Sequence, residues 1–494
     1  MAHLDDHARV LERGDGPFFS KNFVRLFFAA YLVLGLGLIA LTPPFQSPDA
    51  FGHFDRAVGL SEGKIDNTIV DGVAGEHFTV GLFEMETVFS KMSRAPTTTA
   101  TKFEYAYGWQ RTWDMPPYFT SFVYGGNYPF LYVPQTLGVV VGRIVSRHLL
   151  VAYYLAEIFN LLAFIGLTKW AFARFPQRIA LPIGVFLLLP MVNSLAISVN
   201  PDCLLLALSV VFAAALYCNY RESRGQETDP PLTVGPLSRS RHHHLRTNSY
   251  YQIGFASLLF MAIEKPPLIV LGLLLPLADL HSNLRRYARR VVVFMLSTGA
   301  VYELWVTFGA GPKGKSVAHA GVAPLRQLKL ILTNPHLDLV VLATSGRTYG
   351  LLYWKEFIAG IGWLDTWFPG WFYLLVSVVL ALAISNLVLA GRRDIFRTLW
   401  SLFAIALAAS SLVVAFYLVD TSYASTLITG LQGRYFLPLL PVLLVVLSPE
   451  PARVMRLRPV GAVVEEYASF ALIGLQLWIF TSFALTLLRR YWGW

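Results

Sequence analysis

The chain has 494 residues, of which 55% are hydrophobic, 14% aromatic and 14% charged, and its formal net charge is +10. Soluble domains carry about 25% charged residues, so this composition excludes an ordinary soluble protein, a disordered chain and a secreted disulfide scaffold. It indicates a multi-pass membrane protein instead. The Lys and Arg residues lie in short clusters between apolar runs, a pattern that orients membrane helices and does not predict nucleic-acid binding.

The first predicted elements are a polar cytoplasmic N-terminus, residues 1–21, and an apolar span at 23–42. No A-x-A-like cleavage site follows this span, so we expect a retained helix and not a signal peptide. Lys21 and Arg25 flank its start and predict that the N-terminus is cytoplasmic. Residues 43–129 contain no run of spanning length and predict one large periplasmic loop.

Further runs of spanning length follow, and the basic clusters between them mark the cytoplasmic side. These runs are 149–168, 179–198, 201–219, 291–310, 371–390, 398–419, 435–449 and 463–488. The segment 130–145 lies between the large loop and a span that must end at the cytoplasmic side, so it cannot cross fully; we expect it to lie in the outer interface or to dip into the membrane and return.

Basic clusters flank both ends of 250–278, so this segment must enter the membrane and return. It is interrupted at Glu264-Lys265-Pro266-Pro267, and each half has about 13 residues, fewer than the roughly 20 that a span needs.

We therefore expect an all-α polytopic membrane protein with about 11 transmembrane helices, forming one domain over 22–494. A cytoplasmic linker at 220–249 and a periplasmic region at 311–370 complete the topology. The C-terminus is then external, where Arg489 and Arg490 depart from the charge rule.

Unusual polar residues gather on the outer side. Pro48 suits the first turn of a helix in which Asp49 and His53, four residues apart, share one face at the membrane surface. Lys265 would be costly in the bilayer unless it faces a polar cavity or an anionic ligand.

Each of two further residues on the outer side has two possible roles. Asp202 heads a helix, where it either stabilises the N-terminus or takes part in chemistry. Arg434, between Gln432 and Tyr435, either anchors the chain at the interface or binds phosphate through its planar guanidinium.

Several of these stretches resemble a bacterial family of multi-pass membrane proteins of unknown function, DUF2142-like, within the GT-C clan of polyprenyl-phosphate-sugar glycosyltransferases. They are PPFQSPDAFGHFDRA from Pro43, YPFLYVPQTLG from Tyr128, SVNPD from Ser198, EKPP, IGWLDTWFPG and QGRYFLPLLP from Gln432. The resemblance implies a GT-C-like bundle whose large first periplasmic loop carries interfacial helices.

The same resemblance implies an inverting sugar transfer with Asp49 as general base and His53 as its polar neighbour. Lys265 and Arg434 would hold the lipid phosphate, and the remaining substrate-binding positions are Tyr435, Asp202 and Gln432. The family pattern usually reads Pro-Asp-Glu where this chain has Pro-Asp-Ala. The missing second carboxylate at Ala50 weakens the case for a divalent metal but leaves one open.

The expected function is a glycosyltransferase of the bacterial inner membrane, with its active site on the periplasmic face. The donor would be a polyprenyl-phosphate-linked sugar and the acceptor a cell-envelope glycan or glycolipid. One alternative is a polymerase or ligase of lipid-linked oligosaccharides. Another is a transporter or flippase of lipid-linked sugars, although the polar residues crowd the outer side and not the midplane, where transporters bind their substrates.

Overall fold

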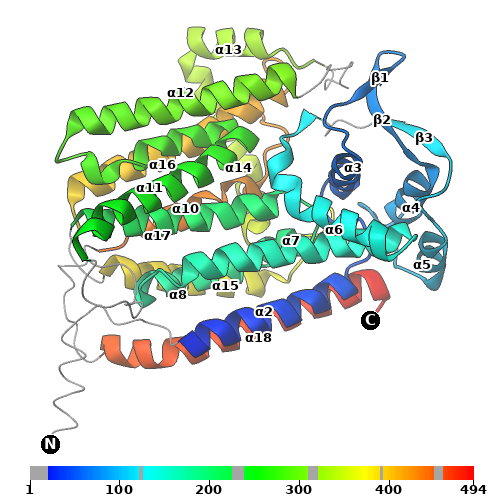
Figure 1. Cartoon of the computed structure of the whole chain (residues 1–494), viewed down its shortest axis with the longest axis horizontal. Coiled ribbons are helices and arrows are strands. Elements are labelled where there is room, and N and C mark those ends of the chain that lie inside the picture. Colours follow the sequence, from blue (N-terminus) through cyan, green and yellow to red (C-terminus); the bar gives the residue numbers. More distant parts are fainter. Residues whose placement is uncertain (1–20, 122–125, 225–238, 310–320, 390–392, 450–459) are drawn as a thin grey trace, which may run out of the picture.

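The computed structural model describes residues 21–121, 126–224, 239–309, 321–389, 393–449 and 460–494. Long helices lie side by side, and a group of short helices with a small sheet covers one end of them (Figure 1). The long helices are α2 (Lys21–Leu41), α7 (Leu149–Phe172), α10 (Asp202–Ser223), α11 (Arg239–Glu264), α12 (Leu284–Phe308), α14 (Pro335–Ala359), α15 (Gly370–Leu389), α16 (Ile395–Val419) and α18 (Val460–Trp492).

The end of the bundle that carries α3 (Ala50–Ser61), α4 (Val80–Ser90), α5 (Lys102–Trp109) and the strands β1 to β3 is called the sheet end below (Figure 1). The remaining helices are short: η2 (Pro129–Tyr132), α6 (Val133–Val145), α8 (Gln177–Leu187), α9 (Pro190–Ala196), η3 (Pro266–Leu274), η4 (Leu277–Asp279), α13 (Pro324–Thr333), η5 (Gly433–Phe436) and α17 (Leu439–Val446).

Among the described residues, seven helices are long and apolar enough to cross a membrane, or eight if the bent pair α8 and α9 forms one span. The multi-pass class is therefore supported, but the number falls short of the predicted eleven or so. Three apolar helical segments are too short to count: Pro129–Val145, Pro266–Asp279 and Gly433–Val446. The last of these contains most of the span predicted at 435–449. It is short because a 3-10 turn and Pro438 precede an α-helix of only eight residues.

The first half of the segment 250–278, which is predicted to enter the membrane and return, is longer than predicted. The chain does break at Lys265, where two prolines follow, but α11 has 26 residues because it begins at Arg239 among polar residues that hydropathy does not mark as helical. The predicted linker 220–249 shrinks accordingly. Its central part, 225–238, and the N-terminal residues 1–20 lie outside the described residues.

The region 43–129 is not purely helical, which corrects the all-α prediction. An antiparallel sheet of order β1-β2-β3 joins β1 (Thr68–Val70), β2 (Val73–Thr79) and β3 (Pro117–Ser121). A Cβ at Gly75 would lie 2.3 Å from the Thr120 carbonyl oxygen, so the close pairing of β2 and β3 requires glycine there. The region 311–370 likewise contains α13, α14 and a two-stranded ladder of β4 (Gly360–Ile361) and β5 (Thr366–Trp367).

Helix α10 is the centre of the bundle. Of the most apolar 18-residue stretch of α10, 94% is buried inside the protein, against 11% for the corresponding stretch of α12. Helix α12 therefore lies at the periphery and offers an apolar face to lipid. Helix α10 packs against α7, α11 and α17.

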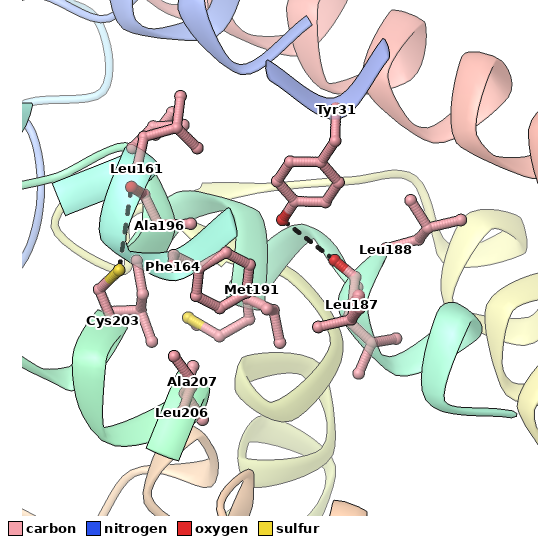
Figure 2. Close-up of a cluster of buried hydrophobic side chains, with 14 of the residues drawn as sticks. Tyr31, Leu161, Phe164, Leu187, Leu188, Met191, Ala196, Cys203, Leu206 and Ala207 are labelled. Carbon is pink, nitrogen blue, oxygen red and sulfur yellow. Dashed lines mark hydrogen bonds between the residues drawn. The ribbon is translucent and has the colours of Figure 1, made fainter. Parts of the chain in front are cut away.

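At the bend of 69° between α8 and α9, side chains donate hydrogen bonds to backbone carbonyls near the break. The Tyr31 hydroxyl of α2 donates to the Leu187 carbonyl at 3.2 Å (Figure 2). The Asn193 amide donates to the carbonyls of Leu188 and Leu189, at 2.9 Å each. The bend is therefore a built feature of the fold.

Helices α2 and α18 run in parallel and both end at the sheet end (Figure 1). Gln476 donates to the Phe27 carbonyl near their middle, and the Trp492 indole donates to the Leu41 carbonyl at their ends. Arg490 is buried there: its guanidinium donates to the carbonyls of Thr98 and Met92, at 2.7 Å each. This arginine therefore stabilises the sheet end.

Replacing Arg490 with Met should lower the free energy of unfolding by about 3 kcal/mol. Arg490 Nη2 lies 3.3 Å from the Asp365 carboxylate, and both side chains are largely buried, so the variant leaves one charge and two carbonyls unpaired. Equilibrium unfolding in mixed micelles measures the change. The neighbouring Arg489 is exposed, so Arg489→Met is the matched control; equal loss in both variants would contradict the assigned role.

A buried carboxyl pair joins α3 to α4. Burial raises the pKa of Asp55 to about 7 and raises the pKa of Glu86 well above its usual range, and the two side chains share a hydrogen bond. Glu86 therefore keeps its proton and donates it to Asp55. Because unfolded carboxyls ionise near pH 4, the folded state holds more protons above that pH, and stability falls as pH rises towards 7.

We therefore expect Glu86→Gln to flatten the dependence of the thermal midpoint on pH between about 4 and 7. The Gln amide donates to Asp55 without taking up a proton. Thermal unfolding in detergent across this pH range is the measurement, with Glu84→Gln on the same helix as control. A slope that stays as steep as in the parent protein would show that the pair does not titrate as described.

Candidate active site

The first component of the site is Asp49, in the turn between α2 and α3. It is the N-cap residue of α3, with φ 62°, a left-handed conformation that Asp tolerates better than most residues. Its side chain makes no capping hydrogen bond to the helix. The helix begins at Ala50, so Pro48 is not in its first turn as predicted. The unusual backbone leaves the carboxylate free to face another element.

That element is η5, which carries Arg434. Asp49 Oδ2 lies 3.3 Å from Arg434 Nη2, across nearly the whole length of the chain. This separation is longer than the 2.7–2.9 Å usual for a charge-assisted bond, so the pair is loosely joined. The guanidinium is almost completely buried, whereas the carboxylate is 38% exposed. Arg434 is therefore not an interface anchor.

Arg434 also has donor atoms that lack a close hydrogen-bond acceptor among the described residues. Its Nε and Nη1 atoms are buried and make no close hydrogen bond within the described part of the chain, although the Tyr435 side chain also interacts with the guanidinium. Unused donors on a buried guanidinium are costly in a folded protein. The arrangement therefore suits a ligand with several acceptor oxygens, such as a phosphate.

Helix α14 fixes the backbone beside this arginine. The Gly433 amide donates to the Glu356 carboxylate at 2.8 Å, and a Cβ at Gly433 would lie 1.8 Å from the Tyr353 carbonyl oxygen. Only glycine fits this contact. Glu356 was not among the predicted site residues, because it lies in the region 311–370, where no spanning helix is predicted. Gln432, the N-cap of η5, has a buried Oε1 without a partner among the described residues.

A second ion pair lies beside the first. Lys265 Nζ, at the end of α11, is 2.6 Å from Asp202 Oδ1, in the first turn of α10. The Lys265 ammonium also lies 4.4 Å from the centre of the Tyr435 ring, which stacks on Phe416. The break at Pro266 turns the chain away and leaves Lys265 at this point. Asp202 thus pairs with a cation in addition to its place at the helix N-terminus.

Hydrogen bonds made by two asparagine side chains stabilise the turn before Asp202. Asn200 Oδ1 accepts from the Asp202 amide at 2.8 Å, and the Asn160 side chain donates to the carbonyls of Ser198 and Asn200. Asn200 in turn donates to the Pro48 carbonyl at 3.3 Å. The segment that carries Asp49 is therefore bonded directly to the one that carries Asp202.

His53 lies close enough to both ion pairs for their charges to act on its imidazole. The charges of four side chains act on its imidazole: Asp49, Asp202, Lys265 and Arg434. Burial lowers the pKa of His53 to about 4, so the ring is neutral at neutral pH and serves as a hydrogen-bonding group.

A polar chain supports His53. Its Nδ1 shares a hydrogen bond of 2.8 Å with the Tyr132 hydroxyl, which accepts from Asn127 Nδ2 at 3.0 Å. The Asn127 carbonyl accepts from Arg56 at 2.7 Å. Neither Tyr132 nor Arg56 was among the predicted site residues, although Arg56 lies three residues after His53 on the same short helix.

The structure therefore brings the seven predicted site residues to one region at the sheet end. They are Asp49, His53, Asp202, Lys265, Gln432, Arg434 and Tyr435. The described residues contain no group of three or more His, Cys, Asp or Glu side chains that could hold a metal ion. Two cations, two carboxylates and a neutral imidazole can bind an anionic oxygen-rich group and accept a proton beside it.

Long apolar helices and a charged, largely buried site at one end define a multi-pass membrane protein. The chain belongs to the family described as Predicted membrane protein (DUF2142), whose model matches residues 32–235 and 239–443. A search of curated proteins and a search of solved structures both found no match. The family description specifies a membrane protein and names no reaction.

Proposed function

We infer that this protein is a glycosyltransferase of the bacterial inner membrane that takes its sugar from a polyprenyl-phosphate-linked donor. The observation that carries the proposal is the meeting of the Asp49 carboxylate with Arg434, at 3.3 Å, beside Lys265. An anionic base next to two cations matches what transfer from a sugar phosphate requires, namely proton removal and stabilisation of a departing phosphate.

In the proposed reaction a hydroxyl of a glycan or glycolipid acceptor attacks the anomeric carbon of the donor. Asp49 takes the hydroxyl proton as the new carbon–oxygen bond forms. The bond between the anomeric carbon and the phosphate oxygen breaks, and its electron pair stays on the phosphate. Attack from the face opposite the leaving group inverts the anomeric configuration, and the products are the glycosylated acceptor and polyprenyl phosphate.

The cations act on the leaving phosphate. Arg434 offers the Nε and Nη1 donors that the described residues leave unused, and Lys265 adds an ammonium 2.6 Å from Asp202. Their stabilisation is strong because the site is largely buried and water is scarce. His53, neutral and held by Tyr132, orients the acceptor or the Asp49 carboxylate.

The proposed orientation follows the basic clusters of the sequence, which put the start of α2 on the cytoplasmic side. The sheet end then faces the periplasm, because α2 and α18 both end there. Acceptors of the cell envelope are available on that face, and the polyprenyl tail stays in the bilayer.

The test is turnover by the purified protein in proteoliposomes. It receives a panel of undecaprenyl-phosphate sugars together with an envelope fraction as acceptor. We expect one donor to be consumed, polyprenyl phosphate to be released and the transferred sugar to have the inverted configuration. Movement of an intact lipid-linked sugar across the bilayer would instead show a flippase, and exclusive use of lipid-linked oligosaccharides would show a polymerase or ligase.

A further inference from the structure

A second polar pocket lies behind the turn that carries Asp49. It is enclosed by the end of α2 with the turn that follows, by α7, by α9 and by the C-terminal part of α18. Its free space is small and suits one ion or one water molecule, not a sugar ring. The polar side chains that line it are Thr42, Gln46, Ser47, Glu157, Ser194 and Ser198.

Two of these side chains present unsatisfied acceptor oxygens. The Gln46 amide nitrogen donates to the carbonyls of Pro44 and Phe89, at 3.2 and 3.0 Å, which fixes the amide and leaves Oε1 as an acceptor. Gln46 Oε1 and Glu157 Oε2 are buried and have no partner in the described ranges, although the Glu157 side chain shares a hydrogen bond with Tyr153; each side chain is only 3% exposed. Both oxygen atoms can therefore bind a cation or accept a hydrogen bond.

The hydroxyl groups add to the surplus of acceptors. Thr42 donates its proton to the Leu38 carbonyl at 2.8 Å, and Ser198 donates to the Leu195 carbonyl at 3.0 Å. Lone pairs remain on both oxygens after these protons are committed, although one of those on Ser198 Oγ accepts from the Asn200 amide at 3.2 Å. Ser47 Oγ is buried and unpartnered among the described residues. None of the residues that line the pocket is Lys, Arg or His.

Helix dipoles add negative potential to the same place. Helix α2 ends at Leu41 and α9 ends at Ala196, so the C-terminal ends of both helices adjoin the pocket. Helix C-termini carry a partial negative charge and recur at cation sites inside membrane proteins. They reinforce the carboxylate of Glu157.

We propose that this pocket binds one monovalent cation, Na⁺, with Glu157 as its charged ligand and Gln46, Ser47 and the neighbouring hydroxyl oxygens as neutral ligands. A single carboxylate balances a single positive charge, whereas Ca²⁺ sites commonly use several carboxylates. The site is separate from the proposed phosphate site, since it shares no side chain with it. The Asn200 contact to Pro48 connects the walls of the two sites.

The experiment measures the thermal midpoint of the purified full chain at fixed pH and ionic strength, with NaCl replaced stepwise by choline chloride. A bound ion raises the midpoint in proportion to the logarithm of its concentration above the dissociation constant. We expect this rise with Na⁺ in the parent protein and its loss in Glu157→Gln. Ser47→Ala should shift the response to higher Na⁺ concentration, and Glu303→Gln, which alters an exposed acid of α12, should leave it unchanged.

A parent protein that unfolds at the same temperature in Na⁺ and choline would overturn the proposal. A midpoint that responds only to acidification, with no Na⁺ effect, would also overturn it, because a proton on Glu157 would then occupy the site. If Glu157→Gln does not fold, a Ser47→Ala response identical to that of the parent is the result that rejects the assignment.

Discussion

Asn in place of Asp49 should reduce sugar transfer by about 10²–10⁴-fold and leave the affinity for the donor nearly unchanged. The amide fills the same space and tolerates the left-handed backbone at φ 62°, but it cannot take a proton from the acceptor. Initial rates of polyprenyl-phosphate release and equilibrium binding of the lipid-linked donor measure the two effects separately.

Asp71 offers a matched control for this variant. It is an exposed Asp of the β1–β2 turn with φ 52°, so Asp71→Asn makes the same chemical change on the same kind of backbone, away from the site. It should retain the parent rate. An Asp49→Asn protein that turns over as fast as the Asp71→Asn protein would show that Asp49 is not the base.

Gln in place of Arg434 should weaken donor binding by about 10- to 100-fold, because a charge-assisted hydrogen bond contributes about 1.5–3 kcal/mol. Transfer should fall further, since the same guanidinium stabilises the departing phosphate. Arg434→Lys keeps the charge but loses the planar fork, so its affinity should lie between the two. Binding of polyprenyl phosphate alone isolates the phosphate contribution.

The exposed Arg489 is the control here too, and Arg489→Gln should bind the donor like the parent protein. The thermal midpoint of each variant separates a loss of binding from a loss of folding. Unchanged affinity in a folded Arg434→Gln protein would remove Arg434 from the phosphate site.

The sequence was sufficient to predict where the polar residues cluster, because the signals are local. The prolines after Lys265 interrupt an apolar run, and Asp202 opens a helix directly after a turn that contains Pro201. Both features put a charged residue at the end of a helix, and helix ends on one side of a bundle meet. The roles assigned to these residues stay predictions.

The partners of these residues were not predictable, because they come from distant parts of the chain. The contact between Arg434 and Asp49 joins residues 385 positions apart, and no pattern in either segment specifies the other. Glu356 lies in α14, which is not among the helices apolar enough to cross a membrane, and in a region where no spanning helix is predicted. The hydrogen bonds of Arg490 to the carbonyls of Thr98 and Met92 were not predictable either, because they join residues more than 390 positions apart.

Hydropathy also predicted more crossings than the described residues contain as helices long and apolar enough to span. It measures how apolar a run is, whereas the segments at 266–279 and 433–446 contain 3-10 turns and prolines that make them too short or too irregular to span. The sheet at 43–129 was missed for a related reason, since β1 has three residues and β3 begins with a proline.

The most direct measurement is a cryo-EM structure of the protein with polyprenyl phosphate bound. We predict phosphate density within hydrogen-bonding distance of Arg434 and Lys265, on the side that faces Asp49, with the tail leaving towards the bilayer. A headgroup bound elsewhere, with Asp49 still paired to Arg434 and no density between the two cations, would contradict the assignment of this site.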